Sequence, residues 1–167
     1  MFKNEQEFRK YLYTFQDLKY KEFHTKIANV DNIIGVRVPK LREIAKKVAQ
    51  NGDRSVLSFN HLTNEELMIH GMVIGYLDVS FEERLKLLDK FIDQMNGWSV
   101  CDSTCATLKS FKKNQKEGFI FIKRLLNDKR IYARRTAFVL LDISPPRGYI
   151  VSNNGWKGCY LPNRAPV

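Results

Sequence analysis

Helical periodicity without any sheet pattern is the feature that most constrains this fold. Between Pro39 and Leu141 no stretch alternates apolar and polar residues for long enough to form a sheet. The same region instead carries two capping boxes, Thr63-Asn64-Glu65-Glu66 and Ser80-Phe81-Glu82-Glu83, each followed by apolar residues at helical spacing. The sequence therefore predicts an all-α chain.

The predicted helices come in pairs that recur at a regular interval. Helix starts near residues 64, 98 and 130 are roughly 33 residues apart, which is close to the period of known helical repeats. Such pairs stack into a curved solenoid whose concave face is lined by one helix of each pair. We therefore expect a HEAT-like helical-repeat solenoid, an α-α superhelix.

Other residues mark further helix ends and a change of character near residue 143. Asp17 is an expected N-cap, and Pro39 is expected at the first position of its helix. Four of the five prolines fall in the last part of the chain, where Ser144-Pro145-Pro146 is incompatible with a helix. We expect one domain over residues 1–142 and an irregular Pro/Gly-rich tail over residues 143–167, either wrapped over the last helix or loose.

The net charge of +10 is concentrated in one block. Residues 1–108 carry equal numbers of basic and acidic side chains, whereas residues 109–135 carry ten basic side chains against Glu117 and Asp128. The ten are Lys109, Lys112, Lys113, Lys116, Lys123, Arg124, Lys129, Arg130, Arg134 and Arg135. This excess favours a nucleic-acid partner over the alternative, a solvated basic face that only keeps the protein soluble.

Trp98 and Asp102 are the residues best placed for chemistry. They are four residues apart at the start of a predicted helix, so they share one helix face next to the basic block. An ionised carboxylate there suits a reaction that builds positive charge on a sugar. The alternative is structural, because Ser99-Val100-Cys101-Asp102 also matches a capping box.

Further basic residues are candidate phosphate ligands. Arg134 and Arg135 lie in the last predicted helix and are suited to bidentate phosphate contacts. Arg37 and Lys40 flank the start of another helix, whose free N–H groups are suited to a phosphate as well. Lys109, Lys112 and Lys113 open the basic block.

No metal or organic cofactor is indicated by the sequence. Cys101 and Cys105 lack two further ligands at metal-binding spacing, so we expect core thiols, and His70 is expected to be a core histidine. There is no phosphate-cradling Gly-rich loop and no nucleophile elbow. With no signal peptide or membrane-length apolar run, we expect a cytoplasmic protein, monomeric and without an obligate protein partner.

Four blocks of sequence carry a resemblance to a known family. In order they are Asn32-Ile33-Ile34-Gly35-Val36-Arg37-Val38-Pro39-Lys40-Leu41-Arg42, Glu66-Leu67-Met68-Ile69-His70-Gly71, Gly97-Trp98-Ser99-Val100-Cys101-Asp102-Ser103 and Ala133-Arg134-Arg135-Thr136-Ala137-Phe138. Over about residues 5 to 142 they resemble the AlkD-like DNA alkylation-repair family. The resemblance implies a HEAT-like DNA glycosylase that removes cationic alkylated purines, such as 7-methylguanine and 3-methyladenine, from double-stranded DNA.

By position, the resemblance makes Asp102 the catalytic carboxylate, Trp98 the aromatic against the sugar of the lesion, and Arg135 the arginine at its backbone. It also implies that the lesion stays stacked while the protein grips the duplex. The chain departs from the family at Val38, where a threonine N-cap is common, and after Asp142, where further helices would hold a second active-site tryptophan. Trp156 does not map onto that residue, so a shortened or frame-shifted C-terminus is a hypothesis.

Two other classes of function remain open from the sequence. One is a non-catalytic helical-repeat module that binds nucleic-acid backbone through residues 109–135, inactive through loss of the C-terminal helices. The other is a protein-binding scaffold, a common use of solenoids. Turnover of alkylated DNA distinguishes the glycosylase from the non-catalytic binding module. A steep salt dependence of binding distinguishes either of these from the protein-binding scaffold.

Overall fold

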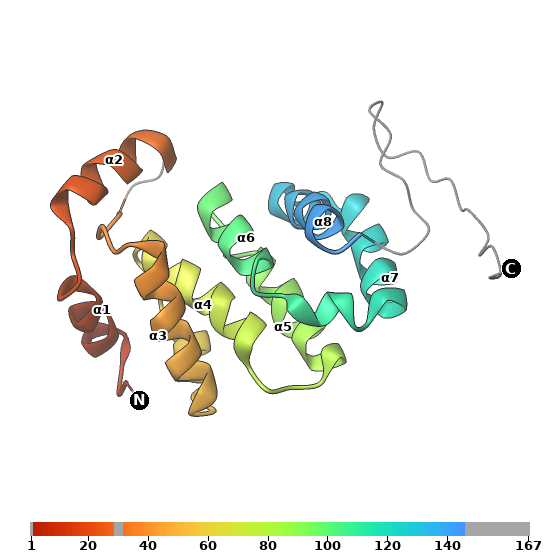
Figure 1. The fold of residues 1–167 in the computed structure, drawn as a ribbon, viewed down its shortest axis with the longest axis horizontal. Helices are drawn as coiled ribbons and strands as arrows, with labels where there is room; N and C mark the ends of the chain where they lie inside the picture. The colour runs from red at the N-terminus through yellow and green to blue at the C-terminus, as the bar shows by residue number, and fades with distance from the viewer. Residues whose placement is uncertain (1, 29–31, 146–167) are drawn as a thin grey trace, which may run out of the picture.

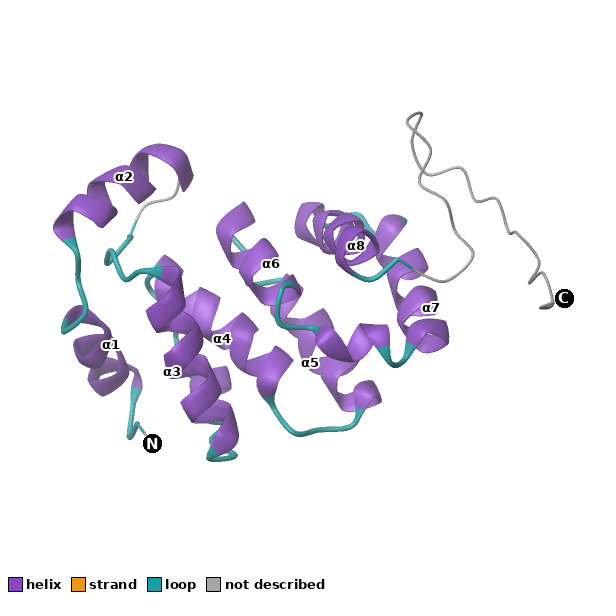
Figure 2. Cartoon of the chain, viewed as in Figure 1, coloured by secondary structure: helices purple, strands orange, loops and turns teal. Residues whose placement is uncertain are grey.

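The computed structural model describes residues 2–28 and 32–145, and these residues form helices and loops without a strand (Figures 1 and 2). The α-helices are α1 (Glu5–Tyr13), α2 (Leu18–Ala28), α3 (Val38–Gln50), α4 (Asn64–Tyr76), α5 (Phe81–Ile92), α6 (Trp98–Cys105), α7 (Gln115–Leu126) and α8 (Ile131–Ile143). Two 3₁₀ helices, η1 (Ser55–Ser58) and η2 (Lys109–Lys112), complete them. The all-α prediction is confirmed, and most of the predicted tail lies outside the described residues.

The helical repeat is visible in the row formed by α4, α6 and α8. These helices begin at Asn64, Trp98 and Ile131, close to the predicted starts, and α6 packs between the other two (Figure 1). Ser99 near the start of α6 donates to Asn64 at the start of α4, which places the two N-termini side by side. Helices α4 and α6 are therefore stacked in the same direction, as expected of repeats.

Two glycines of α4 allow α6 to approach closely. A Cβ added to Gly71 would lie 1.8 Å from Oγ1 of Thr104, and one added to Gly75 would lie 1.8 Å from Oγ1 of Thr107. Any larger residue would force the two helices apart. This contact fixes the position of α6, the helix that carries Trp98 and Asp102.

The central helix α4 is buried over most of its length and is closed at both ends by side chains. Thr63 and Glu66 form the predicted capping box at its N-terminus. At its C-terminus the buried Arg84 of α5 donates to the backbone carbonyl oxygens of Ile74, of Gly75 at 2.8 Å and of Leu77 at 2.7 Å. These bonds satisfy carbonyl groups that a helix end otherwise leaves without partners.

Glu65, which no sequence pattern singles out, holds the loop before α3. Its carboxylate is fully buried and accepts hydrogen bonds from the backbone N–H groups of Ile34 (2.9 Å), Gly35 (2.7 Å) and Val36 (3.2 Å). Charge-assisted bonds of this kind offset the desolvation of a buried carboxylate. The acid therefore joins the start of α4 to the segment that leads into α3.

Some predicted helix ends are wrong by one or more residues. Asp17 does accept from the N–H of Tyr20 at the start of α2, as expected. However, α3 begins at Val38, so Pro39 occupies its second position and Arg37 is the N-cap. The helix predicted to start near residue 98 is short: it ends at Cys105, and the 3₁₀ helix η2 follows after a turn.

Candidate functional site

Asp102 and Arg135 form a bidentate ion pair between α6 and α8. Nε of Arg135 donates to Oδ1 of Asp102 at 2.8 Å, and Nη2 donates to Oδ2 at 2.7 Å. The side chains are 37% and 41% exposed, so both groups are accessible from solvent. The hydrogen bond to Asp102 raises the pKa of the Arg135 guanidinium above its ordinary value.

The capping role that was open for Asp102 is wrong. Helix α6 begins at Trp98 with Gly97 as its N-cap and has no side-chain cap. Ser99 instead donates its hydroxyl proton to Oδ1 of the buried Asn64 (3.2 Å), because packing against α4 places those two groups together. The Asp102 carboxylate is thus left to interact with Arg135.

Trp98 lies at the first position of α6 and is 42% exposed. Because Asp102 follows four residues later in the same helix, the two share a face, as predicted. A large aromatic side chain left this exposed next to a carboxylate is available to a ligand.

A groove of about 670 Å³ opens beside the ion pair along α8. Its lining residues are Asp102, Ile131, Arg134, Arg135, Phe138, Val139, Asp142 and Ile143. Asp102, Arg134 and Arg135, all predicted from the sequence, therefore meet at one surface. Trp98 does not line the groove, although it lies on the same face of α6 as Asp102.

The predicted residues of α3 are not part of that groove. Arg37 donates to Asp17 from Nε at 3.0 Å and from Nη2 at 2.8 Å, and its guanidinium lies over the ring of Tyr20. Lys40 pairs with Glu43 at 3.0 Å and lies over the ring of Phe15. Both cations already have an acidic partner, so any contact with a phosphate would be shared with it or replace it.

Lys109, Lys112 and Lys113 are exposed and have no acidic partner among the described residues. Lys109 and Lys113 border a hollow next to Gly75 and Tyr76, at the C-terminal end of α4. These lysines therefore follow the C-terminal end of α6, whereas Trp98 lies at its N-terminal end. The basic block is not one continuous surface around Asp102.

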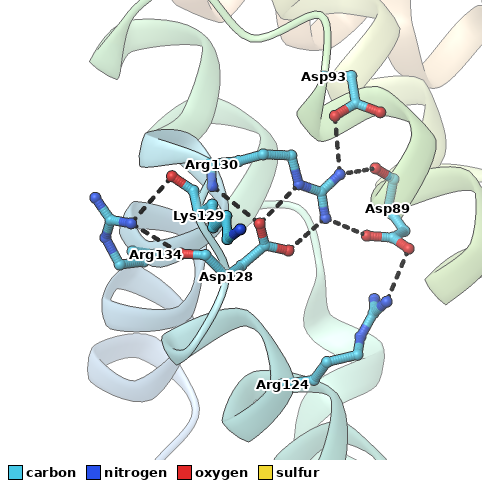
Figure 3. A network of polar contacts seen from close by, with 7 residues as sticks. All are labelled: Asp89, Asp93, Arg124, Asp128, Lys129, Arg130 and Arg134. Carbon is cyan, nitrogen blue, oxygen red and sulfur yellow. Dashed lines mark hydrogen bonds and ion pairs between the residues drawn. The ribbon is translucent and has the colours of Figure 1, made fainter.

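The arginines of the block are mostly bound within the protein (Figure 3). Arg130 pairs with Asp89 (2.8 Å) and Asp93 (2.9 Å) of the α5 region and with Asp128 (2.7 Å), while Arg124 pairs with Asp89 (3.0 Å). The hydrogen bonds from Arg130 lower the pKa of Asp128 well below its usual range. This network ties the turn before α8 to α5, so it supports the helix that carries Arg135.

Arg134 is also hydrogen-bonded within the protein, through one of its guanidinium nitrogens. Its Nη1 donates to the backbone carbonyl oxygens of Asp128 (2.8 Å) and Lys129 (3.1 Å), as Figure 3 shows. No acidic side chain in the described ranges pairs with it. Its charge is therefore uncompensated at the edge of the groove, as the phosphate-binding prediction requires.

The thiols and the histidine belong to the core, as predicted. Cys101 and Cys105 are buried free thiols, and Sγ of Cys101 lies 3.3 Å from Oγ1 of Thr136. His70 is buried, hydrogen-bonded to His61 (2.8 Å), and its pKa is lowered to about 3 by burial. Within residues 2–28 and 32–145 no three metal-ligating side chains gather, and no helix has the length and apolar character of a membrane span.

Fold and site together define a helical-repeat protein with an accessible carboxylate, an arginine and an exposed tryptophan on neighbouring repeats. Residues 5–142 match the family described as DNA alkylation repair enzyme. Because the match covers most of the chain, the protein belongs to that family, which supports a role in DNA repair with DNA as the substrate. No curated protein and no solved structure matches the chain.

Proposed function

We propose that the protein is a DNA glycosylase that hydrolyses the N-glycosidic bond of cationic alkylated purines in duplex DNA. The observation that carries the proposal is the solvent-accessible Asp102 carboxylate, held in place by two hydrogen bonds from Arg135. Family membership supplies the substrate class, DNA with alkylation damage. The acting species is a single chain bound to the duplex.

The chemistry needs a fixed negative charge more than it needs a general acid. A cationic purine leaves with the electron pair of the glycosidic bond and thereby becomes neutral. The sugar is left as an oxocarbenium ion, which the Asp102 carboxylate stabilises electrostatically. Water then adds to C1′ and loses one proton, which Asp102 accepts, giving free base and an abasic site.

Arg135 serves both the carboxylate and the DNA backbone in this scheme. A guanidinium has five N–H donors, and only Nε and Nη2 face Asp102. The remaining donors are free to bind a phosphate next to the lesion. One side chain therefore keeps Asp102 oriented while it places the duplex against α6 and α8.

Trp98 and the N-terminal N–H groups of α6 and α8 complete the proposed contact with DNA. The exposed indole of Trp98 supplies an apolar surface for the deoxyribose, one turn from Asp102. Neither α6 nor α8 has a side-chain cap at its N-terminus, so their first N–H groups are open to phosphate. Lys109, Lys112 and Lys113 add longer-range attraction.

Single-turnover excision tests the proposal. With protein in excess over a duplex that contains one 7-methylguanine, the wild type releases free base, and Asp102→Asn lowers the rate by roughly 100-fold. Glu22→Gln, which changes an exposed acid of α2 whose partner among the described residues is Lys26, is the matched control and keeps the wild-type rate. No release by the wild type, or equal release by Asp102→Asn, contradicts the proposal.

One observation favours an alternative, a module that binds DNA without turnover. Both carboxylate oxygens of Asp102 already accept hydrogen bonds from Arg135. In that function the Asp102–Arg135 pair is only a link between α6 and α8. The same assay separates the two, because a binding module retains salt-dependent affinity for the duplex and releases no base.

A further inference from the structure

A second polar contact joins α6 to α8 behind the Asp102–Arg135 pair. Sγ of Cys101 lies 3.3 Å from Oγ1 of Thr136, and either atom can donate a hydrogen bond to the other. Cys101 directly precedes Asp102, and Thr136 directly follows Arg135. Two consecutive residues of each helix therefore pair across the same interface. The outer pair is partly exposed, whereas the inner pair is fully buried.

The inner contact is a polar point on the buried face of α8. Thr136 is the polar residue of that face, whose other buried residues are Ala133, Ala137, Leu140 and Leu141. Apolar packing is non-directional, so it restrains a small sliding of one helix along the other less than a directional bond does. A bond between a hydroxyl group and a thiol depends on both length and direction. The Cys101–Thr136 contact therefore favours one register of α6 against α8.

The ion pair by itself does not fix that register. Both side chains of the Asp102–Arg135 pair are more than a third exposed, and ion pairs that are open to water contribute little to stability. Arg135 is also long, so its guanidinium can follow Asp102 when the helices shift, at the cost of one of its two parallel bonds. The bidentate geometry then depends on how the backbones of α6 and α8 are placed.

We propose that Cys101 and Thr136 are positioning residues for Asp102, a role that rests on the proposed glycosylase function. Their contact sets the register in which Nε and Nη2 of Arg135 reach both oxygens of Asp102 at once. Both residues are fully buried, so they act through Asp102 and do not touch DNA. A carboxylate held in one orientation stabilises a sugar cation without reorganising during the reaction.

Thr136→Val tests the proposal, because valine keeps the β-branched shape and lacks the hydroxyl group. The first measurement is the Nε–H signal of Arg135 in a proton–nitrogen NMR spectrum, assigned by its absence in Arg135→Lys. In the wild type this proton is hydrogen-bonded to Asp102, so it exchanges slowly with water and its signal differs from those of exposed arginines. Thr136→Val moves the signal toward theirs and speeds the exchange. Thr136→Ser restores a hydroxyl group and keeps the wild-type signal.

Two references separate the register from a general loosening of the fold. Nε of Arg130 donates to Oδ1 of Asp128 at 3.0 Å, so its signal is an internal standard that stays unchanged in every variant. Thr107→Val removes another buried hydroxyl group, whose bond to the carbonyl oxygen of Thr104 stays within a single turn of the chain. Thr107→Val therefore keeps the wild-type signal of Arg135.

Single-turnover excision of 7-methylguanine then links the register to activity. At saturating protein, Thr136→Val lowers the rate by roughly tenfold, because the carboxylate is no longer held in place. Its dissociation constant for the same duplex with a 2′-fluoro sugar, which resists cleavage, stays within about twofold of the wild type, since no residue that faces DNA has changed. Thr136→Ser recovers most of the rate.

Three outcomes overturn the inference. They are an unchanged Arg135 signal in Thr136→Val, an equal change of that signal in Thr107→Val, and a wild-type excision rate in a Thr136→Val protein whose signal has moved. The NMR measurement needs no turnover, so it stays separate from the excision assay. A wild type that shows the NMR effect and releases no base contradicts the proposed function and leaves the register intact.

Discussion

Gly71 of α4 and Thr104 of α6 are in such close contact that a Cβ on Gly71 would lie 1.8 Å from the threonine hydroxyl oxygen. The same Cβ would lie 2.7 Å from Cε1 of Phe91, a buried ring of α5. The position of α6, and with it that of Trp98 and Asp102, therefore depends on a hydrogen atom at residue 71.

Gly71→Ala is expected to destabilise the protein by about 1–3 kcal/mol, the usual cost of overpacking a core. Urea unfolding followed by circular dichroism measures the loss. Thr104→Ala in the same chain removes the nearest obstacle and should recover part of it, although Phe91 remains. Lys90→Ala, an exposed residue of α5, is the control and should leave the unfolding free energy nearly unchanged. An unaffected Gly71→Ala would contradict the close contact.

Glu65→Gln is expected to destabilise the protein by about 1–3 kcal/mol, because the amide keeps the shape but weakens the bonds from Ile34, Gly35 and Val36. The loop before α3 should also become more sensitive to proteolysis. Denaturant unfolding and limited digestion measure the two effects. Glu117→Gln, an exposed acid of α7, is the control. Equal stability of the two variants would show that the buried charge adds nothing.

The helices could be predicted because their signals are local. The Thr63 capping box and the apolar spacing of α4, α6 and α8 act within one or two turns, so they can be read along the chain. The same locality explains the errors. Ser99 and Asp102 have the spacing of a capping box, yet Ser99 bonds Asn64, whose position depends on how α4 and α6 pack.

The contacts of the candidate site could be predicted only where its residues lie close in sequence. Trp98 and Asp102 share a face by the helical period. Arg135 was a candidate phosphate ligand by its type and its helix, but its pairing with Asp102, 33 residues earlier, leaves no trace along the chain. The basic block favours a nucleic-acid partner, but the charge of Arg130 is not all available to one. Arg130 pairs with Asp89, which lies 41 residues earlier, and that pairing leaves no trace in the neighbouring sequence. Glu65 looked like an ordinary acid of a first turn, since its partners are about 30 residues away.

Arg135→Lys tests whether the bidentate hydrogen bonding of Arg135 to Asp102 contributes to excision beyond the positive charge. A lysine keeps the positive charge but cannot donate two parallel hydrogen bonds to Asp102 while it also binds a phosphate. We expect roughly a tenfold loss in single-turnover excision of 7-methylguanine, equivalent to about 1.4 kcal/mol. Lys129→Arg, an exposed position before α8, is the matched reverse change and should leave the rate unchanged. A wild-type rate in Arg135→Lys would reduce the role of Arg135 to charge alone.

The hydrogen-bonded pair of the half-buried His61 and the buried His70 predicts a loss of stability in acid. Burial lowers the pKa of both, that of His70 to about 3, so the folded protein holds them neutral while the unfolded chain binds protons below about pH 6.5. Because the unfolded state then binds more protons, stability falls as the pH drops below 6.5, by up to about 2 kcal/mol for one such histidine at pH 5. Urea unfolding at pH 7.5, 6 and 5 measures the slope. His61→Gln with His70→Gln removes both titrating groups, so its stability should change less over this range; an equally steep slope would assign the acid sensitivity to other groups.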